Sequence, residues 1–409
     1  MIGWLHNLTD DQRKATIAQA AQESGMRAEV VEKDWWVTLV LKALFTTPYA
    51  QYMVFKGGTS LSKCWHLITR FSEDIDIALS PEAFGMKYEE TPSKAYVKKL
   101  KRKGCAFTSN ELKNALEEQL LAMGVPREML TITAAPVPED FPDTDPQTIF
   151  IKYPSLYDPL PYIQDSVKIE VSVRSLHTPY SQQTIQSVLN EFFPQQVYGE
   201  TPFPVTVVEA RKTFLEKAFL LHEEFKKPDR TRIRAERMSR HIYDLASMVH
   251  TSIGLAALSD HQLYEQIITH RKWYTGYTYL DYESLGHSLI RFVLPDDLVE
   301  LYRKDYETMQ EQMIHGDTKN FDELLETMSL LQKRFRLKMD TKTQSIVEEA
   351  RAQLPNALKL QHNPDQVIVT VTHSINPHKP KDENNEDKIY QVQFRMKNGE
   401  AFFEDISVQ

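Results

Sequence analysis

Hydrophobic residues recur at helical spacing over the first 45 positions of the chain. Thr9 precedes an acidic Asp-Asp-Gln segment and predicts a capped helix start, and the helical spacing continues to about Glu23 before Gly25 interrupts it. A second apolar pattern of helical period spans residues 28–44, and Pro48 ends that segment. We therefore expect two helices before the first strand.

The period of the pattern then changes from helix to strand. Residues 52–55 form a short apolar strand that leads into Gly57-Gly58-Thr59, and helical spacing resumes as far as Leu67. Residues 72–79 alternate, with Ile75 and Ile77 on one face and Asp74 and Asp76 on the other. This alternation is typical of a half-buried strand, so the segment predicts a strand, turn, helix, strand unit.

The remaining chain divides into helical and strand-rich regions. Residues 84–130 indicate helices, a proline-rich loop covers 134–148, and two strands follow at 148–153 and 166–173. From Val208 to about Met339 the pattern is almost entirely helical. A strand at 367–372 precedes a polar linker at 376–387, and the apolar segments 390–394 and 401–403 flank Lys397-Asn398-Gly399-Glu400, which predicts a hairpin.

These elements predict an α/β (α+β) fold with a short mixed sheet, a helical domain and a small β appendage at the C-terminus. The expected domains are N-terminal helices at 1–50, a catalytic domain at 51–205, a helical domain at 206–358 and the appendage at 359–409.

Composition narrows the function classes. Of 409 residues, 41% are apolar, which is enough for folded cores, and the net charge of -9 disfavours a protein that coats nucleic acid. The two cysteines, Cys64 and Cys105, lack the spacing of a zinc site or a disulfide framework. We find no signal peptide and no apolar run long enough for a membrane span, so we expect a cytoplasmic protein without a membrane partner.

The strand, turn, helix, strand unit carries the candidate chemistry. Two glycines allow a backbone to approach a phosphate closely, and a helix that starts there favours the negative charge. Asp74 and Asp76 project from one face of a strand, and a divalent cation would neutralise the pair. Oxygen ligands suit Mg²⁺ (or Mn²⁺) together with substrate phosphates. We assign nucleotide binding to a set of five residues around the turn: Lys56, Gly57, Gly58, Thr59 and Lys63.

Glu170 is a candidate third metal ligand beside Asp74 and Asp76. It lies in an apolar alternating strand, on the same face as Lys168 and Ser172. An exposed Glu170 that simply pairs with Lys168 is the alternative interpretation. Ser72 we interpret as a hydroxyl that contacts nucleotide phosphate, because no activating base is visible near it in the sequence.

Two segments around this unit resemble a known family. Phe55-Lys56-Gly57-Gly58-Thr59-Ser60-Leu61 followed by Arg70-Phe71-Ser72-Glu73-Asp74-Ile75-Asp76-Ile77 resembles the AbiEii/AbiGii branch of the nucleotidyltransferase superfamily, whose members include abortive-infection and toxin–antitoxin toxins. Residues 31–36, 215–218 and 240–245 are similar to further family segments. The resemblance covers roughly residues 10–250 and implies a nucleotidyltransferase fold.

The resemblance also implies an activity and residue roles. A nucleotide would pass from an NTP to an acceptor, in some members the 3′ end of tRNA. Ser72 and Asp74 would lie at the catalytic centre, with Asp76 as second metal ligand, Lys217 on the triphosphate and Asp244 completing the site. From the residues alone, Lys217 sits beside an apolar helical stripe and could equally extend to solvent, and Asp244 could pair with Arg240 one turn earlier. His241 we interpret as a helix-surface or hydrogen-bonded histidine, with a general base as the alternative.

Two basic clusters stand out in this acidic chain. One contains six basic residues between Lys94 and Lys103, including Lys98 and Lys99, and the other contains Arg230, Arg232, Arg234, Arg237 and Arg240. If the clusters flank the active cleft, they would hold an RNA backbone or a triphosphate, whereas the alternative is a solvated helix face. Nearby aromatic residues at 273–279 could stack bases, but core packing is the stronger interpretation.

The sequence thus predicts a metal-dependent nucleotidyltransferase that acts on an RNA acceptor, the 3′ end of tRNA, as the toxin of an abortive-infection or toxin–antitoxin system with an antitoxin partner. Kinase-like transfer of the γ-phosphate at the same site is one rival, since both reactions use the same ligands. A nucleotide-binding defence component without turnover is the other.

Overall fold

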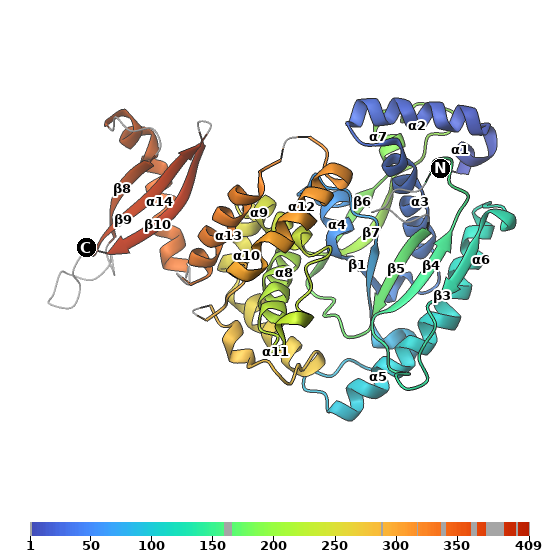
Figure 1. Ribbon diagram of the computed structural model, residues 1–409, viewed down its shortest axis with the longest axis horizontal. Coiled ribbons are helices and arrows are strands. Elements are labelled where there is room, and N and C mark those ends of the chain that lie inside the picture. The colour runs from blue at the N-terminus through green and yellow to red at the C-terminus, as the bar shows by residue number, and fades with distance from the viewer. Residues whose placement is uncertain are drawn as a thin grey trace.

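The chain forms three parts that follow one another along the long axis of the molecule (Figure 1). A computed structural model describes residues 2–158, 166–287, 289–316, 318–336, 341–360, 366–373, 388–397 and 400–408. A sheet with its covering helices comes first, a group of helices follows, and a small second sheet lies at the far end. Among these described segments, no helix has the length and apolarity needed to cross a bilayer.

The first part is built on a seven-stranded mixed sheet, which confirms the predicted fold class. Its strand order is β3-β4-β5-β2-β1-β7-β6. The strands are β1 (Met53–Lys56), β2 (Ile75–Leu79), β3 (Thr131–Ala134), β4 (Gln147–Lys152), β5 (Ser166–Ser172), β6 (Tyr180–Ile185) and β7 (Phe203–Val208). The central strand β2 pairs antiparallel with β1 and parallel with β5. This central pairing determines the geometry of the site.

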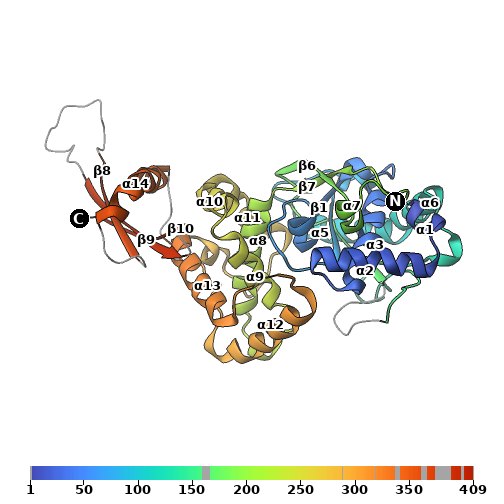
Figure 2. The ribbon, with the colours of Figure 1, turned by 90° about the horizontal axis from the view of Figure 1, so that it is seen from above.

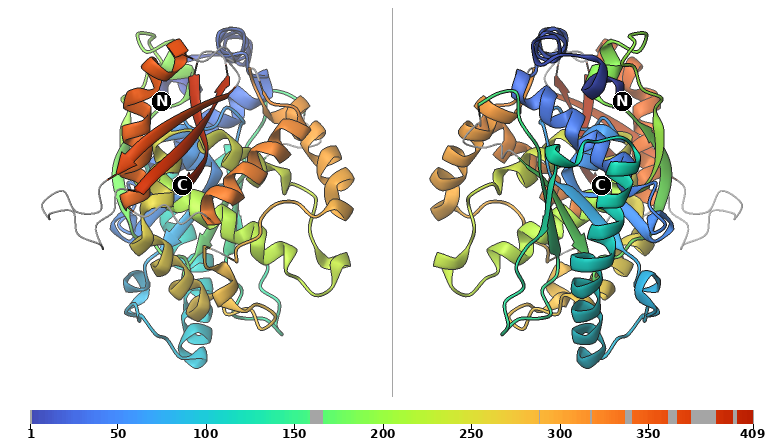
Figure 3. Two further views of the ribbon diagram at one scale, coloured as in Figure 1. Left: turned by 90° about the vertical axis from the view of Figure 1, so that its left-hand side faces the viewer. Right: turned by 90° about the vertical axis from the view of Figure 1, so that its right-hand side faces the viewer.

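One face of this sheet is apolar and covered by helices. These are α1 (Ile2–Asn7), α2 (Asp10–Ser24), α3 (Ala28–Leu44), α5 (Lys94–Phe107), α6 (Lys113–Ala122) and α7 (Val188–Phe192). Phe55, Ile77 and Ile169 point from three strands into this core, where they pack with buried residues of α3. In the right-hand view of Figure 3, the teal helix α6 stands in front of the sheet. The opposite face is therefore left for polar residues.

The two predicted N-terminal helices are confirmed as α2 and α3, whereas the short α1 before them was not predicted. Thr9 caps α2 with a capping box, and Gly25 adopts a left-handed conformation (φ 70°) directly after its last residue. Helix α3 is buried on nearly all sides, so its polar residues Glu32, Lys33 and Asp34 are buried as well. Buried charges require partners. Glu32 accepts hydrogen bonds from Ser155 and Leu156, Lys33 pairs with Glu73, and Asp34 pairs with Lys63.

The sequence pattern predicted four of the seven strands and placed the start of one too early. Strand β2 begins at Ile75, so Asp74 lies in the irregular segment before it. Strands β3, β6 and β7 were not predicted. Pro204 lies within β7, opposite Thr184 of β6. It is tolerated there because β7 pairs with β1 only at Val207, away from the missing N–H.

The second part is helical and packs around its own core, as the sequence predicted for the region after Val208. Its helices are α8 (Ala210–Phe225), α9 (Ser239–Met248), α10 (Ser252–Ser259), α11 (His261–Tyr274), α12 (Val299–Met313) and α13 (Phe321–Arg336). The end of α12 reaches back to the first part, where Phe71 N–H donates to Met313 O at 2.7 Å and Arg70 bridges Ile314. The segment before Asp74 is thus attached to the helical part by backbone pairing.

The third part contains α14 (Thr341–Leu360) and three antiparallel strands, β8 (Gln366–His373), β9 (Lys388–Lys397) and β10 (Glu400–Val408). Residues Ile346 and Ala350 of α14 share a small core with these strands. Figure 2 shows this part beyond α13, where Arg334 donates to the backbone carbonyl of Phe403. The predicted linker at 376–387 and the turn residues Asn398 and Gly399 lie outside the described residues. The predicted domain boundaries remain predictions.

Candidate active site

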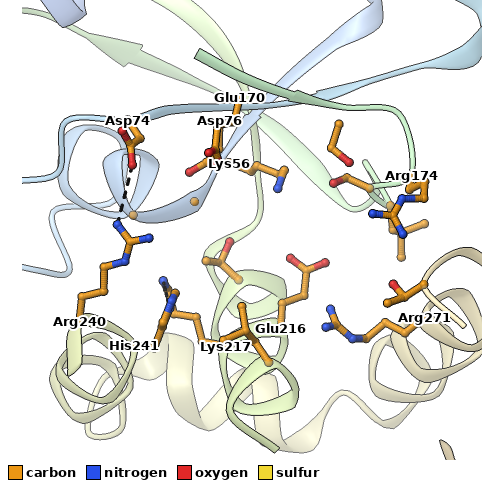
Figure 4. Close-up of a pocket in the computed structure, with 18 of the residues that line it drawn as sticks. Lys56, Asp74, Asp76, Glu170, Arg174, Glu216, Lys217, Arg240, His241 and Arg271 are labelled. Atoms are coloured by element: carbon orange, nitrogen blue, oxygen red, sulfur yellow. Dashed lines mark hydrogen bonds and ion pairs between the residues drawn. The ribbon is translucent and has the colours of Figure 1, made fainter. Parts of the chain in front are cut away.

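A polar cavity of about 390 Å³ lies between the uncovered face of the sheet and helices α8, α9 and α11 (Figure 4). Among the described residues, seven cationic side chains and four carboxylates line it, although the whole protein carries a net charge of -9. The cations are Lys56, Arg70, Arg174, Lys217, Arg234, Arg240 and Arg271, and the carboxylates are Asp74, Asp76, Glu170 and Glu216. A cavity of this size and charge suits an anionic small molecule.

The sheet brings three predicted site residues into one row. Lys56 of β1 is the Cα partner of Asp76 on β2, and Asp76 is the Cα partner of Glu170 on β5. Paired residues of adjacent strands project from the same face, so all three side chains reach the cavity, with Asp74 beside them. Residues more than 110 positions apart in sequence are neighbours because β5 pairs with β2.

The row contains two carboxylates, Asp76 and Glu170, and only one ammonium group, Lys56, so its net charge is negative when both carboxylates are ionised. Burial, together with the nearby carboxylates of Glu170 and Asp74, raises the pKa of Asp76 to about 6, although Lys56 and Arg240 act in the opposite direction. Lys168 pairs with Glu170 at 2.5 Å, and Arg240 Nη1 lies 3.8 Å from Asp74 Oδ2 across the cavity. A cation bound beside Asp76 would therefore favour the ionised form of this carboxylate.

The two glycines of the turn make room for the site itself. Gly57 has a φ of 78°, and a Cβ added there would lie 2.0 Å from Asp76 Oδ2. A Cβ on Gly58 would lie 2.6 Å from Arg70 Nη2 and 2.8 Å from Ser72 Oγ. The glycines are thus required because three site side chains crowd against the first turn of α4 (Gly57–Lys63).

Two residues assigned to nucleotide binding do not line the cavity. Thr59 is fully buried, and its hydroxyl donates to the backbone carbonyl of Asp74 at 2.5 Å. Lys63 lies at the end of α4, where its ammonium pairs with Asp34 of α3 at 2.5 Å. Both side chains hold the turn in position, because their polar atoms are already engaged inside the protein. Lys56, Gly57 and Gly58 do line the cavity.

Asp244 forms a buried ion network instead of lining the cavity. Its side chain is 0% exposed and binds Arg70 Nε and Nη2 at 2.7 and 2.8 Å and Lys217 Nζ at 2.8 Å. Burial alone would raise the pKa of Asp244, but the two cations lower it to about 2. Its partner is therefore not Arg240, and Asp244 acts on the cavity through Arg70 and Lys217, which both line it.

His241 lies between Lys217 and Arg240 on the helical side of the cavity (Figure 4). Burial, Lys217 and Arg240 together lower its pKa well below the ordinary value of 6.5. The Lys217 ammonium lies 3.4 Å from His241 Nδ1. The imidazole is thus neutral at physiological pH and partly buried. It is held by a hydrogen bond, as the sequence interpretation expected.

The segment around Ser72 is anchored from α3 as well as from the helical part. Glu73 is buried and pairs with Lys33 at 3.4 Å and with Arg237 at 2.9 Å. Lys33 also donates to the backbone carbonyl of Ser166 at the start of β5. Ser72, which follows the backbone pairing at Phe71, lines the cavity. Side chains on both sides of the site therefore fix this segment.

The structure separates the members of the arginine cluster. Arg234 lines the cavity and pairs with Glu224 at 2.8 Å. Arg230 pairs with Asp297, Arg232 with Asp229 at 3.3 Å, and Arg237 with Glu73, and these three do not line the cavity. Lys98 and Lys99 are exposed on α5, outside the cavity lining. Carboxylates distant in sequence therefore pair with Arg230 and Arg237, whereas Arg232 pairs with a residue three positions earlier.

Sequence reasoning missed one end of the cavity. Arg174, Glu216 and Arg271 line it together with Thr213 and His270. Arg174 is held by Asp145 at 2.8 Å, and Arg271 is held by both carboxylate oxygens of Glu223. The available signal was the helical spacing of Thr213, Glu216 and Lys217, which places all three on one face of α8.

The side chains around Asp76 fit a divalent cation in chemistry but do not form a complete metal site. Carboxylate oxygens are the ligands that Mg²⁺ prefers, and it commonly takes one or two of them with phosphates and water. In the described segments, no three acidic, histidine or cysteine side chains are grouped closely enough to hold a metal ion. A cation here would therefore need ligands from the substrate in addition to Asp74 and Asp76.

Comparison with known proteins gives one match. The sequence model of a family described as nucleotidyl transferase AbiEii toxin, type IV TA system, matches residues 39–327. This range contains the sheet row, the turn and the helical side of the cavity. Searches of curated proteins and of solved structures found no match.

Proposed function

The chain belongs to the AbiEii nucleotidyl transferase toxin family of type IV toxin–antitoxin systems, and from this premise we propose that it transfers a nucleotide from an NTP to a hydroxyl of an RNA acceptor, the 3′ end of tRNA. Membership gives a nucleotidyltransferase toxin with a nucleotide substrate and an antitoxin partner. The proposal adds the acceptor, the divalent cation, the participating residues and a role in antiviral defence.

The observation that carries the proposal is the opposition of charges across the cavity. Lys56, Asp76 and Glu170 form one row on the sheet, and Lys217 and Arg240 face them from α8 and α9. Cations on the helical side are suited to hold a triphosphate, while the carboxylates on the sheet side are suited to a cation bound to the same phosphates. A transfer reaction at the α-phosphate needs both.

Individual roles follow from what each side chain can reach. Lys56 and Lys217 supply positive charge to the phosphates, and the Ser72 hydroxyl donates to a phosphate oxygen. Asp74 and Asp76 would hold Mg²⁺ or Mn²⁺, which when bound would activate the attacking hydroxyl and stabilise the leaving pyrophosphate. Glu170 would be the third ligand once Lys168 releases it. Asp244 is a positioning residue, because it contacts Lys217 and Arg70 and not the cavity.

The RNA acceptor would approach along cations at the edge of the site. Arg234 lines the cavity with 61% of its side chain exposed, which supports a contact with RNA or the triphosphate. Lys98 and Lys99 on α5 would add weaker, salt-dependent contacts to the backbone. Arg230, Arg232 and Arg237 would contribute less, since each is paired with a carboxylate. NTP and tRNA are both cytoplasmic, so we place the reaction there.

A label-transfer assay tests the proposal. The protein is incubated with total RNA, MgCl₂ and each α-labelled NTP, next to Asp74→Ala and Asp76→Ala variants. We expect label at RNA 3′ ends with the wild-type protein, loss of that label in both variants, and loss after chelation of the metal. Asp11→Ala, which changes an exposed aspartate on α2, serves as the matched control and should retain activity.

Two outcomes would contradict the proposal. Equal labelling by the wild-type protein and both cavity variants would end the assignment of Asp74 and Asp76. Label from γ-labelled but not α-labelled NTP in RNA would mean phosphoryl transfer in place of nucleotide transfer.

A further inference from the structure

The end of the cavity beyond the carboxylate row contains a carboxylate, Glu216, that no role above uses. It lies on α8 next to Lys217 in sequence, and Thr213 and Leu220 line the cavity from the same helix. Positions 213, 216, 217 and 220 are spaced by three and four residues, so their side chains share one face of the helix. This face presents Glu216 to a ligand that Lys217 already contacts in the proposed function, on which the following inference rests.

Glu216 is held in its ionised form. Burial would raise its pKa, but Lys212, Lys56 and Arg271 lower it. Lys212 lies one turn earlier on α8, is fully buried, and pairs with Glu216 at 3.0 Å. An ionised carboxylate only accepts hydrogen bonds, so Glu216 can recognise a ligand only through the ligand's donors.

The position of Glu216 relative to the carboxylate row indicates which part of a nucleotide it meets. Lys56 acts electrostatically on both Asp76 and Glu216, and Figure 4 shows it between the two carboxylates. Glu216 is therefore separated from Asp76 by one lysine side chain. In an NTP whose α-phosphate lies at Asp76, the neighbouring groups are the ribose and the β-phosphate. An ionised Glu216 repels the β-phosphate and accepts hydrogen bonds from the ribose hydroxyls, so the ribose is the group that fits beside it.

A second observation points to a bound group at this position. Thr213 is only 4% exposed, yet its hydroxyl Oγ1 has no hydrogen-bond partner in the described part of the chain. His270 Nε2 at the same end of the cavity is also without one among the described residues. Buried polar atoms are normally satisfied, so unsatisfied atoms at the wall of a cavity indicate that a polar ligand completes them.

We infer that Glu216, with Thr213 beside it, binds the 2′,3′-diol of a ribose and makes the site selective for ribonucleotides. Both ribose hydroxyls would donate to the Glu216 carboxylate, and one would also exchange a hydrogen bond with Thr213 Oγ1. A carboxylate in this role is known from dinucleotide sites, where an acidic residue binds the ribose 2′-hydroxyl. The diol belongs either to the NTP or to the terminal nucleotide of the acceptor, and the experiment separates these sources.

Binding of NTPs to the full-length protein is measured by calorimetry in MgCl₂ without acceptor, for the four NTPs and their 2′-deoxy counterparts. For the wild-type protein we expect a preference for ribose of about tenfold to a hundredfold, as for a hydrogen bond to a charged group. Glu216→Gln should bring this ratio close to one with little change in affinity for the 2′-deoxy nucleotides. Glu118→Gln, which changes an exposed glutamate on α6, should keep the wild-type ratio.

The second arm uses an acceptor RNA whose 3′-terminal nucleotide is either ribose or 2′-deoxyribose, with affinity measured by fluorescence anisotropy. A ribose preference that Glu216→Gln removes only in this arm would assign the diol to the acceptor. Glu216→Gln removes the carboxylate that pairs with the buried Lys212 and leaves its ammonium only the backbone carbonyl of Leu176, so the double variant Lys212→Met, Glu216→Gln is measured in parallel. If the single variant fails to fold, the double variant replaces it in both arms and should show the same loss of ribose preference.

The outcomes are distinguishable. If the wild-type protein binds no NTP, the proposed function fails and this inference fails with it. If NTPs bind but ribose and 2′-deoxyribose are equivalent in both arms, or if the variants keep the wild-type ratio, only the inference is overturned. A changed order among the four bases with an intact ribose preference would likewise overturn it and assign Glu216 to the base.

Discussion

Replacing Asp244 by asparagine tests how strongly the buried network holds the helical side of the site. The carboxylate is fully buried between Arg70 and Lys217, and its pKa of about 2 lies below the ordinary value of 3.8. A difference of this size corresponds to about 2–3 kcal/mol of stabilisation at neutral pH. Removing one partner of a buried ion network costs about 3–5 kcal/mol, since unpaired charges remain. We expect Asp244→Asn to lower the free energy of unfolding by about 2–4 kcal/mol at pH 7.

The pH dependence identifies the carboxylate as the cause. A carboxyl group whose pKa is lowered by folding stabilises the folded protein above the ordinary pKa, and this stability is lost as the pH falls through the folded value. The gap between wild type and Asp244→Asn in urea unfolding should therefore be full at pH 7 and shrink below about pH 4. Asp297→Asn, which breaks the exposed pair with Arg230, is the matched control and should stay close to wild type.

Two results would refute this reasoning. One is a loss in Asp244→Asn no larger than that in Asp297→Asn, because the buried network would then contribute nothing special. The other is a loss of equal size at neutral pH and at about pH 3, which would show that packing of the amide and not the missing charge is responsible.

Three further variants give sharp expectations. Gly57→Ala should abolish label transfer and lower stability, because the added Cβ would meet Asp76. Gly25→Ala is its control: Gly25 has a similar positive φ but open space around it, so this variant should lower stability and keep label transfer. In metal-free buffer at pH 7, Asp76→Asn should unfold at a higher temperature than wild type, because Asp76 with its pKa of about 6 costs stability once it is ionised. Magnesium with NTP should raise the melting temperature of wild type but not that of Asp76→Asn. Burial lowers the pKa of His222 to about 4, so this histidine should contribute about 3 kcal/mol to the stability that wild type loses as the pH falls from 6.5 to 4. His222→Gln should lose correspondingly less in urea unfolding.

Features that depend on neighbours along the chain could be predicted from the sequence. The cap at Thr9 and the helix end at Gly25 were identified because both are set by residues within one helical turn. The side of β2 that carries Asp76 followed from alternation alone. The carboxylate on β5 was identified as a candidate by the same alternation, but its exact alignment with Asp76 came from the strand pairing.

Features that depend on partners distant in sequence could not be predicted. Lys63 looks like a phosphate ligand beside the glycine turn, yet Asp34, 29 positions earlier, engages it. The arginine cluster looks like a binding surface, yet Glu73 and Asp297 neutralise two of its members. Nothing local to a basic residue reveals whether a carboxylate will reach it, so the free and the paired cations are separated only by the fold.

The acidic and basic residues of the segments that resemble the family therefore have two different physical tasks. Asp76 and Lys217 reach the cavity, whereas Glu73 and Asp244 bind cations below it and do not line it. The second group matters because the segment carrying Ser72 has no strand of its own to hold it, and it depends on ion pairs from α3 and α9 and on the backbone of α12. Since α9 and α12 belong to the helical part, the position of this segment reports the position of the helices. A shift of α9 away from this segment would break the pair between Arg70 and Asp244, so the buried network links the stability of the protein to the position of the segment that carries Ser72.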